Sequence, residues 1–139
     1  MIAIDSSVLI DLLGGDTLAE SAEESLRQAL TRGPVVVCDV VVSEVVSGLG
    51  YGGELLDSLE NAGIAFSAIE SSAAVRAGEM QRRYKERRKA AGLVATGPRT
   101  VPDFLIGAHA LLQCTGLIRK SGTVRGPVAT RPAALRRSL

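Results

Sequence analysis

The stretch MIAIDSSVLIDLL (residues 1–13) decides the fold class. Residues 2–4 are apolar and favour β-structure, and the run ends at Asp5. Residues 6–13 are typical of a helix, with Ser6 or Ser7 as the expected N-cap. A short buried strand that leads directly into a helix is the first unit of an alternating β–α chain.

The same alternation continues to residue 118. The pattern predicts strands at 35–38, 64–69 and 117–118, and helices at 17–30, from 39 or 40 onward, 54–61, 71–91 and 101–115. The β-branched run 35–42 could also form one long strand, but a strand that ends near Cys38 is preferred. We therefore predict an α/β fold in three layers, with a short parallel sheet of about four strands flanked by helices.

Length and composition narrow the class of protein. A chain of 139 residues supports one domain, and 46% hydrophobic with 22% charged residues excludes extensive disorder. No apolar run approaches the roughly 20 residues that span a bilayer. Asp5 stands where a signal peptide needs a basic end, so the expected compartment is the cytoplasm. Cys38 and Cys114 are expected to be buried free thiols.

The charges are unevenly distributed along the chain. Residues 1–118 hold all 15 acidic residues, whereas residues 119–139 hold six basic residues and no acid. We therefore divide the chain into a compact domain over 1–118 and a basic C-terminal tail over 119–139. Such a tail is either poorly ordered or suited to an anionic partner.

Three acidic residues stand out by their context. Asp5 follows a strand, at the edge of a parallel sheet where functional groups gather. Glu44 lies among valines, where an unpartnered carboxylate is costly, and Asp103 opens an apolar helix. Taken singly, Asp5 and Asp103 are explained as a helix cap and a first-turn acid, but Glu44 is not.

Taken together, the three acids suggest a metal site. Carboxylate oxygens are the ligands that Mg²⁺ and Mn²⁺ prefer, and a bound ion of this kind activates water and stabilises charge on a phosphodiester. Asp11 is expected on the helix surface, Asp39 and Asp16 as helix caps, and His109 as a packed structural residue.

Three segments carry a resemblance to a known family: MIAIDSSVLIDLL, VVVCDVVVSEVVSG and RTVPDFLIGAHALL. In order and spacing they resemble the PIN-domain family, specifically the VapC toxins of bacterial toxin–antitoxin pairs. The resemblance implies a metal-dependent ribonuclease acting on RNA such as tRNA or ribosomal RNA, with Asp5, Glu44 and Asp103 as catalytic metal ligands for Mg²⁺ or Mn²⁺. It also implies Ser6 as a residue that orients the carboxylates, a cognate antitoxin, and a homodimer.

The resemblance ends near residue 118. Family members carry a fourth acid in a TRD-like motif, whereas this chain reads LIRKSGTVRG over 117–126, with Lys120 at about that place. Either the site works with three carboxylates, or Lys120 alters or abolishes activity, or the gene has lost its original reading frame near residue 118.

The basic run at the end of the 71–91 helix has two readings of equal weight. It is a solvated helix face, or it contacts the RNA backbone through Arg82, Arg83, Arg87 and Arg88. The leading function is that of an RNA-hydrolysing toxin. The alternatives are a catalytically impaired PIN-like domain that only binds antitoxin or RNA, and a nuclease acting outside any toxin system.

Overall fold

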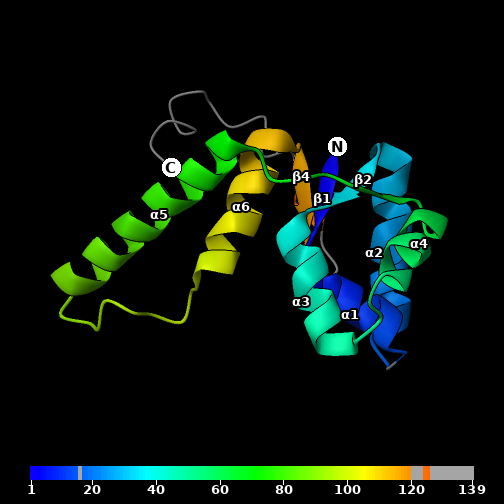
Figure 1. Cartoon of the computed structure of the whole chain (residues 1–139), viewed down its shortest axis with the longest axis horizontal. Helices are drawn as coiled ribbons and strands as arrows, with labels where there is room; N and C mark the ends of the chain where they lie inside the picture. Colours follow the sequence, from blue (N-terminus) through cyan, green and yellow to red (C-terminus); the bar gives the residue numbers. More distant parts are fainter. Residues whose placement is uncertain (16, 120–123, 126–139) are drawn as a thin grey trace.

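The structure, a computed structural model, describes residues 1–15, 17–119 and 124–125. Strands and helices alternate along the chain, as predicted (Figure 1). Their bounds are β1 Ile2–Ile4, α1 Ser6–Gly14, α2 Ala19–Arg32, β2 Val35–Val37, α3 Asp39–Leu49, α4 Glu54–Asn61, β3 Ile64–Phe66, α5 Ser71–Ala90, α6 Val101–Gln113, β4 Gly116–Ile118 and β5 Val124–Arg125.

The strands form one sheet in the order β3-β2-β1-β4-β5. The first four strands along the chain run parallel, and β5 is antiparallel to β4. The first strand is therefore the central one, with Ile2 opposite both Val35 of β2 and Gly116 of β4. This arrangement confirms the predicted α/β fold and brings the ends of β1, β2 and β4 to one edge.

Helices cover both faces of the sheet (Figure 1). One face packs against α1 to α4 and includes the buried side chains of Ile4, Leu9 and Leu55. The other packs against α6, where Ala3 and Leu117 contact Ala110. Side chains that alternate between the faces explain why the strands read as continuous apolar runs. No helix in the described ranges is long and apolar enough to cross a membrane.

Helices α5 and α6 form an arm at one side of the molecule (Figure 1). The rings of Tyr84 and Phe104 pack with centroids 5.5 Å apart, and the Arg88 guanidinium lies 5.8 Å from the Tyr84 ring centre. Arg88 Nε also donates to the carbonyl of Val94 at 2.7 Å. The loop that joins the helices is thereby folded back onto α5.

Long-range polar contacts end the third strand earlier than predicted, at Phe66 rather than 69. Gln113 of α6 donates to the carbonyl of Ala68 and accepts from the backbone N–H of Glu70, both at 2.9 Å. Asp39 Oδ1 accepts from the N–H of Ile69 at 3.3 Å. Side chains of other elements thus satisfy backbone groups that a longer strand would have paired.

Several local predictions need correction. Asp5, not Ser6 or Ser7, is the N-cap of α1. Asp39 is the first residue of α3 and follows the N-cap Cys38. Helix α2 begins at Ala19 rather than at 17. Asp16, Lys120 and most of the tail 119–139 lie outside the described residues, so their predicted roles stay predictions.

Candidate active site

Asp5 is held at the end of β1 by the residues that follow it. Its Oδ1 accepts from the backbone N–H of Ser6 at 2.8 Å and from the Ser6 hydroxyl at 3.4 Å. Its Oδ2 accepts from the Ser7 hydroxyl at 3.2 Å. Asp5 caps α1 with an extended backbone, and this conformation follows from its place between strand and helix. The predicted contact of Ser6 is present, and sequence reasoning missed that of Ser7.

Glu44 lies on α3, one and a half turns from its start, and is half-buried. Its Oε1 is fully buried and has no hydrogen-bond partner among the described residues. Burial raises the pKa of Glu44, the Ser6 hydroxyl opposes this, and the negative charges of Asp5 and Asp103 raise the pKa further. Asp5 and Asp103 therefore both lie within electrostatic range of Glu44, although the three acids are far apart in sequence.

Asp103 is exposed in the first turn of α6. Its Oδ2 accepts from the backbone N–H of Thr100 at 2.7 Å and from the Thr100 hydroxyl at 3.1 Å. The same carboxylate therefore caps its helix, and it also lies within electrostatic range of Glu44. The segment TVPD shows this signal in the sequence, since a Thr three residues before an acid is a capping-box pattern.

An open groove of about 590 Å³ runs between α3 and the start of α6. Glu44 is in its wall, together with Ser43, Ser47 and Pro102. A volume of this order falls in the range of ligand-binding clefts, roughly 300–1,000 Å³. The groove gives an extended ligand access to Glu44.

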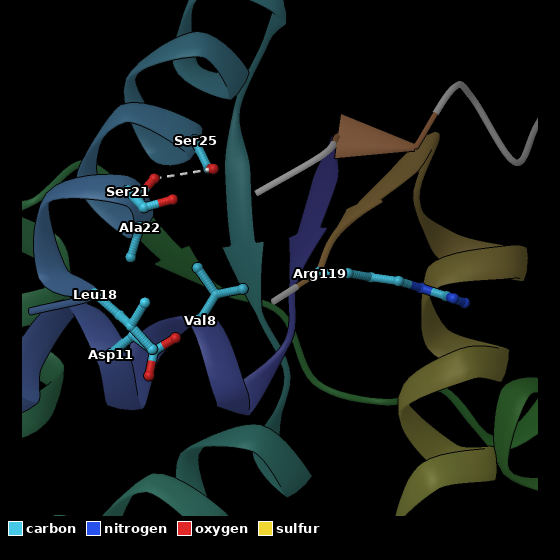
Figure 2. Close-up of a pocket in the computed structure, with 7 residues that line it drawn as sticks. All are labelled: Val8, Asp11, Leu18, Ser21, Ala22, Ser25 and Arg119. Atoms are coloured by element: carbon cyan, nitrogen blue, oxygen red, sulfur yellow. Dashed lines mark hydrogen bonds between the residues drawn. The ribbon is translucent and has the colours of Figure 1, made fainter. Parts of the chain in front are cut away.

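A second pocket, between α1 and α2, is much smaller (Figure 2). Its volume of about 20 Å³ suits a single water molecule. Asp11 lines it and is only 8% exposed, so the prediction of a surface residue is wrong. Asp11 follows Val8 by one helical turn and shares its buried side of α1, next to Ala22 of α2.

The remaining candidates are structural. His109 is buried, its Nε2 lies 3.1 Å from the Ser67 hydroxyl, and burial lowers its pKa. Cys38 and Cys114 are buried free thiols, and burial raises the pKa of Cys114 to about 11. Neither thiol is suited to nucleophilic attack, because the reactive form is the thiolate. The expectations for these three residues are confirmed.

The donor chemistry of the acids fits a divalent cation. Three carboxylates that repel one another, one with a buried and unpartnered oxygen, are stabilised by a hard positive ion. Within the described part of the chain, however, no group of three or more His, Cys, Asp or Glu side chains is close enough to hold a metal ion. Asp5 and Asp103 therefore act electrostatically on Glu44, but the three acids do not form a closed ligand cluster in the described residues.

Fold and site together define a class of protein: a compact α/β domain with an acid, Asp5, at the carboxyl end of its central parallel strand and a half-buried glutamate, Glu44, within electrostatic range of it. The chain belongs to the PIN domain family, whose profile matches residues 2–123. This is a family of nucleases that generally use divalent metal ions.

The fold is also that of a solved toxin. The chain is similar to VapC20 of Mycobacterium tuberculosis, described as a sarcin-ricin-loop-cleaving toxin, with a TM-score of 0.58 and 15% sequence identity. The similarity covers 84% of this chain and 87% of that one. No curated protein matches the chain. The comparison confirms the VapC-like PIN fold.

Proposed function

We propose that this protein is a metal-dependent endoribonuclease and the toxin of a toxin–antitoxin pair. The observation that supports this most is the Glu44 carboxylate, which carries a buried oxygen without a partner among the described residues and lies within electrostatic range of Asp5 and Asp103 inside a PIN fold. A protein rarely keeps such a group unless a ligand compensates it.

Each acid has its own part in the proposed reaction. Asp5, Glu44 and Asp103 would hold a Mg²⁺ or Mn²⁺ ion, which would supply an activated water and stabilise charge on the phosphodiester when bound. Ser6 and Ser7 fix the Asp5 carboxylate, and Thr100 fixes that of Asp103. The groove between α3 and α6 receives the RNA strand.

Charge supports an RNA substrate. Residues 71–100 hold eight basic and two acidic residues, whereas residues 1–70 hold two basic and twelve acidic residues. The basic arm is thus the part of the described chain that attracts phosphates. We assign backbone contacts to Arg82, Arg83 and Arg87 among the predicted residues. Arg88 is engaged with Tyr84 and Val94, so we assign it to holding the loop.

Ribosomal RNA is the first substrate to test, because VapC20 is described as cleaving the sarcin-ricin loop, and tRNA is the second. Purified protein is incubated with each RNA in Mg²⁺, Mn²⁺ or EDTA. We expect cleavage with either metal, none in EDTA, and a loss of at least a hundredfold in Asp5→Ala. The matched control is Asp57→Ala, which removes an exposed acid of α4 and should cleave like the native chain.

Equal cleavage by the native chain and Asp5→Ala would reject the proposed site. The second candidate, a PIN-like domain that only binds antitoxin or RNA, is favoured by one observation: no acid follows Asp103 in the sequence. It predicts RNA or antitoxin binding by the native chain without metal-dependent cleavage. Cleavage of DNA alone would instead place the protein outside toxin systems.

The proposal extends to partners and location. We propose a cognate antitoxin that covers the acidic groove, a homodimer, and action in the cytoplasm. Co-purification with the product of the adjacent gene tests the first, with loss of RNA cleavage in the complex as the expected result. Light scattering at several concentrations tests the second.

A further inference from the structure

The residue beside Asp5 on the neighbouring strand is a cation. In the parallel register Ile4 of β1 is opposite Ile118 of β4, and the Asp5 N–H donates to the Ile118 carbonyl at 3.1 Å. Asp5 directly follows β1, and Arg119 directly follows β4. The two residues are therefore neighbours at the same edge of the sheet.

Strand alternation places both residues on one face. Ala3 and Leu117, two residues earlier in each strand, pack against Ala110 of α6. Because side chains alternate with a period of two, Asp5 and Arg119 follow on the α6 face. Figure 2 agrees: the Arg119 side chain extends away from Asp11 and from the α1–α2 pocket that its residue helps to line.

Arg119 is an exposed residue. Among the described residues it makes no hydrogen bond or ion pair, and the described ion pairs use Arg27, Arg76 and Arg82 instead. A counter-ion role would show as an ion pair between Arg119 and Asp5, which the described residues do not form. A guanidinium that has no partner among the described residues and stands next to an acidic residue is a place for an external anion.

We propose that Arg119 binds a phosphate of the RNA substrate beside Asp5, which rests on the proposed ribonuclease function. The planar guanidinium fork matches two phosphate oxygens and provides charge-assisted hydrogen bonds. It offsets the repulsion between three carboxylates and a polyanion. The same positive charge opposes binding of a metal ion at the acids. Arg119 thus strengthens RNA binding and weakens metal binding.

Two binding measurements test this without turnover. The first is the Kd of a fluorescent ribosomal-RNA hairpin in EDTA, and the second is the Kd of Mn²⁺ by calorimetry without RNA. For Arg119→Ala we expect RNA affinity to fall about tenfold, as for the loss of one charged hydrogen-bonded contact. We expect Mn²⁺ affinity to rise about two- to fivefold, because a like charge is removed. Arg119→Lys should restore most of the RNA affinity.

The matched control is Arg82→Ala, an exposed cation on the arm. It should weaken RNA binding and leave Mn²⁺ affinity unchanged. Native RNA affinity in Arg119→Ala, unchanged Mn²⁺ affinity, or no measurable RNA binding by the native chain would each overturn the proposal. A thermal unfolding curve that matches the native one shows that the variant is folded. Failure of the nuclease is scored separately, by equal cleavage in the native chain and Asp5→Ala.

Discussion

Arg88 lies over the ring of Tyr84, with its guanidinium carbon 5.8 Å from the ring centre, and donates through Nε to the carbonyl of Val94. One basic residue of a highly charged helix is therefore committed to the protein itself. Neighbouring Arg82 remains largely exposed, with only a surface contact to Glu86. The basic helix thus contains exposed cations, such as Arg82, and a cation that fastens a loop, Arg88.

The two kinds of cation separate in an RNA-binding experiment. Removing a cation assigned to the RNA backbone, by Arg82→Ala, Arg83→Ala or Arg87→Ala, should reduce the slope of log K against log salt by about 0.7–0.9 each. Arg88→Ala should leave the slope unchanged and lower the melting temperature instead. Affinity is measured in EDTA between 50 and 200 mM salt, as roughly the range in which such slopes are resolved. Equal slopes for all four variants would contradict the division.

Gly97 should be needed for its lack of a side chain. A Cβ at this position would lie 2.2 Å from Tyr84 Oη and 2.6 Å from Arg88 Cδ. The side chains of Tyr84 and Arg88 would therefore have to move apart. Gly97→Ala should destabilise the protein by about 1–3 kcal/mol, the usual cost of overpacking. Gly78→Ala is the control, because nothing lies within 4 Å of its Cβ and α5 continues through it.

In the control, Gly78→Ala should stabilise the chain by about 0.5–1 kcal/mol, since alanine is the better helix former. Both free energies of unfolding are measured by urea titration of metal-free protein. Equal stabilities of the two variants would show that the Tyr84–Arg88 contact does not hold the loop.

Glu44 should make stability depend on pH in the absence of metal. Its pKa is raised by burial and by Asp5 and Asp103, so the folded state favours the protonated form. The native state loses stability as pH rises from the unfolded pKa, about 4.3, through the raised folded pKa. The Glu44→Gln variant should lack this loss of stability. At pH 7 its melting temperature should exceed that of the native chain by about 3 °C for each ~1 kcal/mol gained in the free energy of unfolding.

Metal should stabilise the native chain more than the Glu44→Gln variant. Mn²⁺ should raise the melting temperature of the native chain, since a ligand that binds only the folded state stabilises it. It should raise that of Glu44→Gln much less. A higher melting temperature for the native chain than for Glu44→Gln at pH 7 in EDTA would count against the strained carboxylate.

The titration of His109 should affect stability at a higher pH than that of Glu44. In this range stability should rise with pH, whereas the titration of Glu44 makes it fall. Burial lowers its pKa, while Asp39 and Glu70 act against this shift. The unfolded state therefore binds the proton more readily, and stability is lost as pH falls from about 6.5 through the lowered folded pKa. His109→Gln should lack this loss. Melting temperatures are measured at pH 7.5, 6.5 and 5.5 for proteins with and without His109→Gln, both carrying Glu44→Gln. If both proteins lost the same melting temperature as pH falls, the prediction would be wrong.

The order of the helices and strands, the buried strands and the start of α6 could be predicted from local sequence. Continuous apolar runs mark strands buried on both faces, as in Val35–Val37. Pro102 and an acid in the first turn mark the start of α6. These signals depend on residues within one turn of each other, which a sequence displays directly.

The misplaced details depend on contacts between distant segments. β3 ends early because Gln113 and Asp39 bind the backbone beyond it. Asp11 is buried because α2 packs over its side of α1, although its charge suggested exposure. For the same reason local sequence could nominate Asp5, Glu44 and Asp103 individually, and their mutual approach required the parallel topology.

The position of the first strand at the centre of the sheet sets the timing of folding. Strand β1 at residues 2–4 pairs with β4 at 116–118, which is synthesised more than 100 residues later. The central strand therefore gains its second neighbour only after β4 has been made, so the complete edge of the sheet that carries Asp5 forms late on the nascent chain.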